Sequence, residues 1–204
     1  MKLGIGLLVG GVLLSLASIS SASITDWSCG PDTDGAIDCT AGWNSGSYTL
    51  TITGTQYWGP GHMVGDFTTD TDEDPTVGMV NYIDNDTDFA WSDYHVTIYM
   101  SKTFTISGAY VGYPTDWTPN TVTVQPPPLA GDFVDSHGTH WPYAGTVDYF
   151  AGTDVQIGGM LVFGYAISFA GGISYEQEMY PTPEPATISL LVLGGLAMLR
   201  RRRK

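Results

Sequence analysis

Aspartates at alternate positions are the residues of this chain best suited to chemistry. They cluster in three acidic runs, residues 32–38, 70–74 and 84–88. Oxygen ligands at alternate positions suit calcium. The run 84–88 is not an EF-hand loop, because the sixth and twelfth positions counted from Asp84 are Phe89 and His95. The run 32–38 is not one either, because Gly35 comes early and the twelfth position counted from Asp32 is Trp43. We expect either solvated acidic loops without an ion, and so no cofactor, or at least one calcium site. The calcium ligands would be Asp32, Asp34, Asp38, Asp84, Asp86 and Asp88.

A second pattern suited to metal binding is the segment DSHGTH. It brings Asp135, His137 and His140 into one glycine-containing stretch. A loop that curls back could use these side chains to bind a transition metal. In a strand, positions 137 and 140 would point to opposite faces, so a loop of ordinary polar side chains is the alternative.

No motif for catalysis is present in the sequence. Neither GxSxG nor HExxH occurs, and carboxylate pairs carry no information in so acidic a chain. The near absence of lysine and arginine also removes most side chains that stabilise oxyanions or phosphates. The sequence therefore predicts a protein that is not an enzyme.

The elements that would position these residues are strands. Polar and apolar residues alternate along 94–100, and along 160–170 the apolar residues of one face are Leu161, Phe163, Tyr165, Ile167 and Phe169. A two-residue period is typical of half-buried strands. Gly171-Gly172 then makes a turn, and the segment 172–180 continues the alternation. We therefore predict that 160–170 and 172–180 form a hairpin with Glu176 and Glu178 facing solvent. No convincing amphipathic helix occurs between 23 and 182. We predict an all-β fold, a single antiparallel β-sandwich of the Ig-like or jelly-roll-like kind.

The charge of this predicted domain, residues 23–182, limits its partners. Of the 21 acidic residues only Glu184 lies outside it, and of the seven basic residues only Lys102 lies inside it, which leaves a net charge of −19. Such a surface repels phosphate, so we expect no binding of nucleic acid or of anionic membranes. Cations remain plausible partners.

The N-terminus has the composition of an export signal. Lys2 precedes an apolar run from Leu3 to Ile19, and small residues follow. Ser20 and Ala22 fit a small-x-small cleavage site, so residues 1–22 are predicted to be a signal peptide that forms a helix and is cut after Ala22. An uncleaved membrane anchor is the alternative.

The C-terminus combines a short motif, an apolar run and a basic cluster. Pro183, Glu184 and Pro185 come first, and residues 186–199 follow as an apolar run. A helix of this length covers roughly 21 Å, less than the ~30 Å of bilayer hydrocarbon. We predict a short transmembrane helix that holds the chain transiently, with the terminal basic cluster on the cytoplasmic side. This cluster consists of Arg200, Arg201, Arg202, Arg203 and Lys204.

These three parts, in this order at the chain end, resemble a PEP-CTERM sorting signal covering 183–204. The resemblance implies a bacterial protein that is exported, handled by an exosortase in the inner membrane, and then released or transferred to the cell surface or matrix. It implies a bacterium that has an outer membrane and makes exopolysaccharide and biofilm. The signal occurs on many unrelated domains, so it does not identify residues 23–182.

The export prediction bears on the two cysteines, Cys29 and Cys39. Two nearby cysteines in an exported chain favour one disulfide. A metal or redox pair is the alternative.

Three classes of function follow from these observations. The first is a non-catalytic surface or matrix protein with a structural or adhesive role linked to exopolysaccharide. The second is a carbohydrate-binding module that recognises surface polysaccharide through exposed tryptophans, although loop tryptophans more often cap a core. The third is a secreted glycan-active enzyme.

Overall fold

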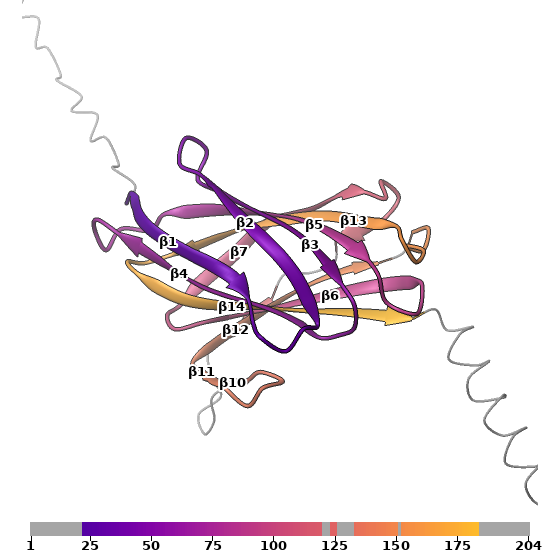
Figure 1. The fold of residues 1–204 in the computed structure, drawn as a ribbon. Helices are drawn as coiled ribbons and strands as arrows, with labels where there is room; N and C mark the ends of the chain where they lie inside the picture. The colour runs from indigo at the N-terminus through magenta and orange to yellow at the C-terminus, as the bar shows by residue number, and fades with distance from the viewer. Residues whose placement is uncertain (1–21, 120–122, 126–132, 151, 184–204) are drawn as a thin grey trace, which may run out of the picture.

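The fold is a two-layered β-sandwich, seen in a computed structural model that describes residues 22–119, 123–125, 133–150 and 152–183. Within these residues fourteen strands, β1 to β14, form two facing sheets and one small hairpin (Figure 1). The all-β sandwich predicted from the alternating patterns is confirmed.

The first sheet, called sheet A, follows the order β1-β4-β14-β6-β12-β8, with β9 also paired to β12. Every strand pair in it is antiparallel. Its strands are β1 Ile24–Pro31, β4 Gly61–Thr69, β14 Ile173–Pro183, β6 Trp91–Met100, β12 Tyr143–Phe150, β8 Thr118–Pro119 and β9 Thr123–Gln125.

The second sheet, called sheet B, follows the order β2-β3-β5-β13-β7. One pair, β3 with β5, is parallel, and the others are antiparallel. The antiparallel prediction thus fails at one point, where the chain returns to sheet B after passing through β4 of sheet A. The strands are β2 Ile37–Asn44, β3 Thr49–Gln56, β5 Thr76–Asn85, β13 Met160–Phe169 and β7 Phe104–Tyr113.

A hairpin of two short strands lies outside the sandwich. Strands β10 (Phe133–Val134) and β11 (His140–Trp141) pair with each other and lie on the outer side of sheet A (Figure 1). The connection between them, residues 135–139, holds the first five residues of the DSHGTH segment, and the sixth, His140, begins β11.

The predicted hairpin across Gly171-Gly172 is wrong. Strand β13 pairs with β5 and β7 in sheet B, whereas β14 pairs with β4 and β6 in sheet A. The turn therefore carries the chain from one sheet to the other. Gly171 has a φ of +66°, a conformation that favours glycine.

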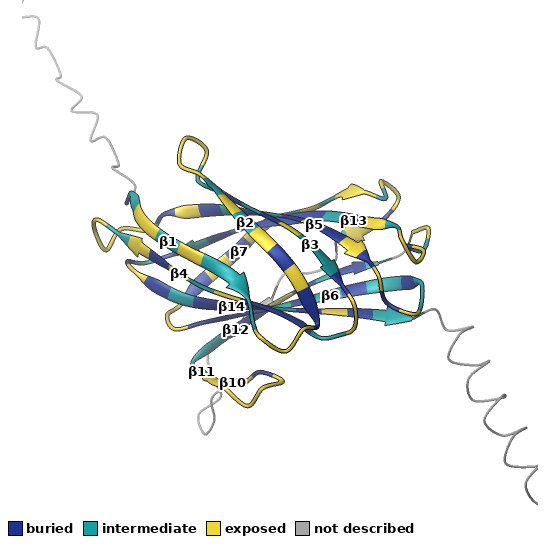
Figure 2. Cartoon of the chain, viewed as in Figure 1, coloured by how far each residue is buried: buried dark blue, intermediate teal, exposed yellow. Residues whose placement is uncertain are grey.

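The core lies between the sheets and is built from inward-facing residues of both. Figure 2 shows buried and exposed residues alternating along the strands. The five predicted inward residues of β13 are all at most 3 % exposed. A bulge occurs at Gly108: its φ is +59°, and the β13–β7 register shifts between Gly164 and Ala166.

Two buried glutamines connect the sheets through polar contacts. Tyr94 of β6 donates its hydroxyl hydrogen to Gln56 Oε1 of β3 at 2.6 Å, and Gln56 Nε2 donates to the Met179 carbonyl of β14 at 3.1 Å. Gln177 of β14 accepts from the Tyr165 hydroxyl of β13 and donates to Asn81 Oδ1 of β5. Because buried polar groups are costly without partners, these contacts favour one alignment of the two sheets.

The described region ends where the predicted signal peptide and the predicted sorting signal adjoin the sandwich. Ala22 is 1 % exposed, and the backbone nitrogen of Ser23 donates to Asp70 Oδ1 at 2.7 Å. At the other end β14 runs to Pro183, where it still pairs with Trp91 of β6. Residues 1–21 of the signal peptide, Glu184, Pro185, the apolar run and Arg200–Lys204 lie outside the described residues. In the part of the chain that is described, no helix has the length and apolarity needed to cross a membrane.

Candidate metal centre

A buried histidine on the outer face of sheet A lies at the centre of a polar cluster. His62 is the second residue of β4, and its neighbour Met63 points into the core, so His62 points outward. In the register of β4 with β14 it lies opposite Glu178, next to Glu176 on the same face. Despite facing outward, His62 is 0 % exposed and Glu176 is 3 % exposed.

The cover over these residues is the β10–β11 hairpin, which Asp135 holds in shape. Its Oδ1 accepts the backbone N–H groups of His137 and Thr139 at 2.9 and 2.8 Å, and its Oδ2 accepts the indole N–H of Trp141 at 2.9 Å. Burial works against the carboxylate, but these donors outweigh it and lower the pKa of Asp135. The next residue, Ser136, then lies with its Oγ 2.7 Å from His62 Nε2.

His62 and Glu176 form a tight buried pair. His62 Nδ1 lies 2.6 Å from Glu176 Oε1. Burial disfavours the imidazolium, yet the adjacent carboxylate outweighs it and raises the pKa of His62. For Glu176, burial has the opposite effect and raises the pKa of the carboxyl, although the contact with His62 works against this shift. The pair fixes the imidazole so that Nδ1 faces Glu176 and Nε2 faces the hairpin.

The remaining members of the cluster come from the β1–β2 connection and from the tip of the hairpin. His137 Nδ1 lies 3.2 Å from Asp32 Oδ2, and His137 Nε2 lies 3.5 Å from Asp34 Oδ2. The His137 ring stacks on that of His62, with centroids 3.9 Å apart. Asp34 accepts the backbone N–H of Ala36 at 2.7 Å, and its own N–H donates to Asp32 Oδ1 at 3.2 Å, so the connection is a tight turn.

Two groups of described residues present ligand atoms close enough to share a metal ion. In each, one ligand atom per residue lies within 4.8 Å of the others. The first group is Asp32, Asp34, His62 and His137, and the second is His62, Glu176 and Glu178.

The predicted calcium ligands are divided by the fold. Asp32 and Asp34 come together as expected, but Asp38 lies on β2 and is exposed, and it belongs to neither group. Asp84, Asp86 and Asp88 also belong to neither. They face solvent, while the intervening Asn85 and Thr87 are buried and hydrogen-bonded to each other. Calcium binding at these residues stays a prediction.

The DSHGTH segment contributes one of its three expected ligands to these groups. His137 joins the first group, whereas Asp135 serves the hairpin and His140 lies in β11. The sequence analysis missed His62. Its partners Glu176 and Ser136 are 114 and 74 residues away, and no local pattern signals those contacts.

The predicted disulfide between Cys29 and Cys39 is not formed, and both cysteines are free thiols. Cys29 belongs to β1 of sheet A and Cys39 to β2 of sheet B, and each faces another partner. The Cys39 thiol lies 2.7 Å from Met63 Sδ, and Cys29 contacts the hydroxyl of Tyr175. Burial raises the pKa of both thiols, that of Cys39 to about 12.

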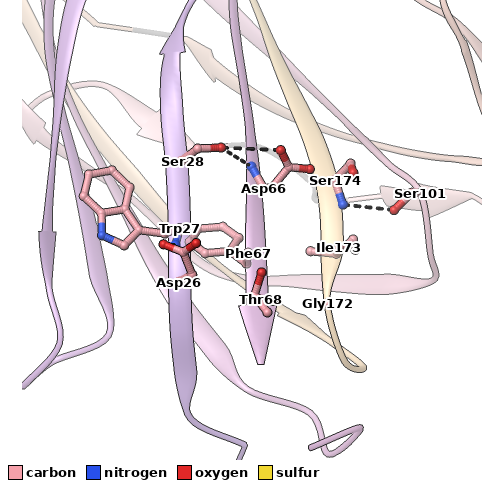
Figure 3. A pocket seen from close by; sticks show the side chains of 10 residues that line it. All are labelled: Asp26, Trp27, Ser28, Asp66, Phe67, Thr68, Ser101, Gly172, Ile173 and Ser174. Carbon is pink, nitrogen blue, oxygen red and sulfur yellow. Dashed lines mark hydrogen bonds between the residues drawn. The ribbon is translucent and has the colours of Figure 1, made fainter. Parts of the chain in front are cut away.

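A shallow groove of about 480 Å³ crosses the other end of sheet A (Figure 3). Ser28 of β1 and Asp66 of β4 are hydrogen-bonded, and the backbone N–H of Ser174 donates to Ser101 Oγ. Its two aromatic residues serve the core: Phe67 is 1 % exposed, and Trp27 packs against Trp43. The groove is therefore polar and offers no flat apolar platform.

An aromatic surface does occur on the outer face of sheet B, and it is built from tyrosines. Tyr82 of β5 and Tyr113 of β7 both pair with Val162 of β13, and Tyr110 of β7 pairs with Gly164, two residues further along β13. These three tyrosines, which we call the tyrosine face, are 38 %, 56 % and 43 % exposed for Tyr82, Tyr113 and Tyr110. Among the tryptophans, Trp58 is 48 % exposed, whereas Trp91 and Trp117 are buried.

Comparison with known proteins identifies the C-terminal segment. Residues 181–204 match the PEP-CTERM protein-sorting motif. No curated protein and no solved structure shows significant similarity to the chain. The chain thus carries a PEP-CTERM sorting motif, which implies processing by an exosortase and an exported protein associated with the membrane or the cell surface.

Proposed function

We propose that the sandwich is a non-catalytic protein of the cell surface or extracellular matrix, with a structural or adhesive role linked to exopolysaccharide. The observation that carries the proposal is the junction at Pro183. Strand β14 is flanked by β4 and β6, and the matched motif overlaps its last residues. An exosortase that cuts at Pro183–Pro185 would therefore separate the tail from the sandwich without removing a strand.

The acidic character of the sandwich supports a role outside the cell. A net charge of −19 over residues 23–182 keeps single copies apart and leaves cations to mediate contacts between them. A hydrated, anionic matrix is an environment in which such a surface stays soluble.

The proposal is tested by deleting the gene in the native bacterium and comparing cell aggregation and biofilm texture. We expect a changed texture that is restored by the full chain. The matched control is the full chain carrying Glu184→Ala, which leaves every described residue intact and should fail to restore the texture. An unchanged biofilm in the deletion strain would overturn the proposal.

A second candidate function, binding of surface polysaccharide, is favoured by the tyrosine face. Each tyrosine offers a flat apolar ring with a hydroxyl at its rim, which complements a sugar ring with apolar faces and hydroxyl edges. Tyr82 and Tyr113 are two strands apart, roughly 10 Å at the usual strand spacing. That separation suits contact with more than one sugar of a chain.

The test for this second function is retention of the protein on polysaccharide isolated from the same bacterium. Tyr82→Ala and Tyr113→Ala should each weaken retention at least tenfold. Tyr180→Ala removes a tyrosine that is 49 % exposed on the opposite sheet and should leave retention unchanged. Equal retention of all three variants would rule out the tyrosine face as the binding surface.

A further inference from the structure

We propose that Asp32, Asp34, His62 and His137 bind one divalent transition-metal ion. This inference goes beyond delivery and adhesion, and it does not depend on the tyrosine face. It differs from the calcium expectation because two of the four ligands are imidazoles.

The four donor atoms are already gathered. All lie within 4.8 Å of one another, whereas bonds of 2.0–2.1 Å in a tetrahedral site place neighbouring donors roughly 3.3 Å apart. The site must therefore contract, and its exposed members can move. The side chain of His137 is 41 % exposed, so its ring can rotate off His62 to direct one nitrogen at the ion.

The buried pair beneath the site orients the fixed ligand. Metal-binding histidines usually donate their second N–H to a carboxylate, which sets the tautomer and the ring orientation. Glu176 occupies this position at 2.6 Å from His62 Nδ1, leaving the Nε2 lone pair directed at the cluster. There it now meets the Ser136 hydroxyl at 2.7 Å, which an ion would displace.

The local charge favours a cation. Asp135, Glu176 and Glu178 surround the four ligands, which adds three carboxylates to those of Asp32 and Asp34. Lys102 is the one lysine or arginine among the described residues, and it lies near Gly171. That end of the sheet is five residues along β4 from His62, roughly 17 Å away. Among the described residues, no lysine or arginine therefore lies close enough to neutralise these carboxylates.

The donor set indicates the class of ion. Calcium and magnesium take oxygen ligands, whereas imidazole together with carboxylate suits zinc, copper, nickel or iron. The second group, His62, Glu176 and Glu178, fits less well, because it offers only one imidazole and its His62 and Glu176 side chains are almost wholly buried. The first group is partly open to solvent and gives an ion a path of entry.

A bound ion would join three segments that are distant in sequence. Asp32 and Asp34 precede β2, His62 is the second residue of β4, and His137 lies at the tip of the β10–β11 hairpin. Metal binding would lock the hairpin onto sheet A. At 100-fold excess over Kd, ligand binding of this kind raises the Tm of a domain of this size by roughly 5–10 °C.

The test uses the full chain, stripped of metal with a chelator and titrated with Zn²⁺ by calorimetry. We expect one Zn²⁺ per chain and no comparable binding of Ca²⁺. The Co²⁺ form should show visible absorption with the intensity of a tetrahedral site, which reports the ligands directly. His137→Ala and Asp34→Asn, both at partly exposed positions, should each weaken Zn²⁺ binding at least tenfold.

The matched control is His95→Ala. His95 is 42 % exposed and lies 2.7 Å from Asp148, so it resembles His137 in exposure and in having an aspartate partner. It belongs to neither metal group and should bind Zn²⁺ like the unmodified chain. Glu176→Gln should weaken binding roughly 10–100-fold through the orientation of His62. The proposal is overturned by the absence of saturable Zn²⁺ binding, by tighter Ca²⁺ binding, or by equal affinities of the His137→Ala and His95→Ala variants.

Discussion

Replacing Tyr94 by phenylalanine tests how the two sheets are held in alignment. Tyr94 and Gln56 are both 0 % exposed, and the hydroxyl donates to Gln56 Oε1 at 2.6 Å. The substitution removes the donor, keeps the ring, and leaves a buried amide oxygen without its partner. The cost of such a group is about 1–3 kcal/mol.

The corresponding thermal shift follows from the size of the domain. At about 2–4 °C per kcal/mol for 150–250 residues, a loss of ~2 kcal/mol lowers Tm by roughly 4–8 °C. Urea unfolding followed by tryptophan fluorescence measures the same loss as a lower midpoint with an unchanged slope. Tyr180→Phe, at an exposed position on β14, is the control and should stay within ~0.5 kcal/mol of the unmodified protein. If Tyr94→Phe is as stable as this control, the polar bridge does not contribute to holding the sheets together.

Three further predictions concern packing, the thiols and pH. Gly164→Ala should destabilise the protein by ~1–3 kcal/mol in urea, because its Cβ would meet a tyrosine ring at 2.5 Å and a backbone oxygen at 2.7 Å. Gly42→Ala, whose Cβ would have no atom within 4 Å, should be close to neutral, and equal losses would contradict the packing described. With a pKa of about 12, the Cys39 thiol should resist alkylation at pH 8 in the folded protein and react after unfolding, when mass spectrometry should count two labels per chain; a count of zero would indicate a disulfide. The hydroxyl and N–H of Thr153 lower the pKa of Asp116, so its stabilising contribution is present above the ordinary value of 3.8 and is lost as pH falls through the lowered pKa. Asp116→Asn should therefore reduce stability at pH 7 and have less effect near pH 3, and an effect of equal size at both pH values would contradict this.

The strands of the core were predictable because their pattern is local. Along β13 large apolar residues alternate with polar or small ones, which indicates the buried face, and the structure follows that alternation. The bulge at Gly108 was predictable for the same reason, since a glycine interrupts an otherwise regular run.

The pairing of strands was not predictable from such patterns. Two alternating runs joined by Gly171-Gly172 look alike whether they pair or cross between sheets, and here they cross. The parallel pairing of β3 with β5 likewise depends on where β4 lies, which no local signal gives.

Only part of the proposed metal site could be predicted from the sequence, for the same physical reason. Asp32 and Asp34 lie two residues apart, so their proximity is local. His62 and His137 join them only because β4 pairs with β14 and the β10–β11 hairpin covers that face. Glu176 shows the same effect, since it faces outward as the alternation predicts and is nevertheless buried by the hairpin.

The central claim is that the sandwich is exported and separated from its C-terminal tail, and the intact mass of the protein tests it most directly. The measurement is made on protein purified from the native cell surface and from the medium. We expect a chain that begins near Ser23 and ends near Pro183, with any additional mass reporting attached glycan. A chain that retains Arg200–Lys204 would contradict the account and would make the sandwich a domain still joined to its membrane-directed tail.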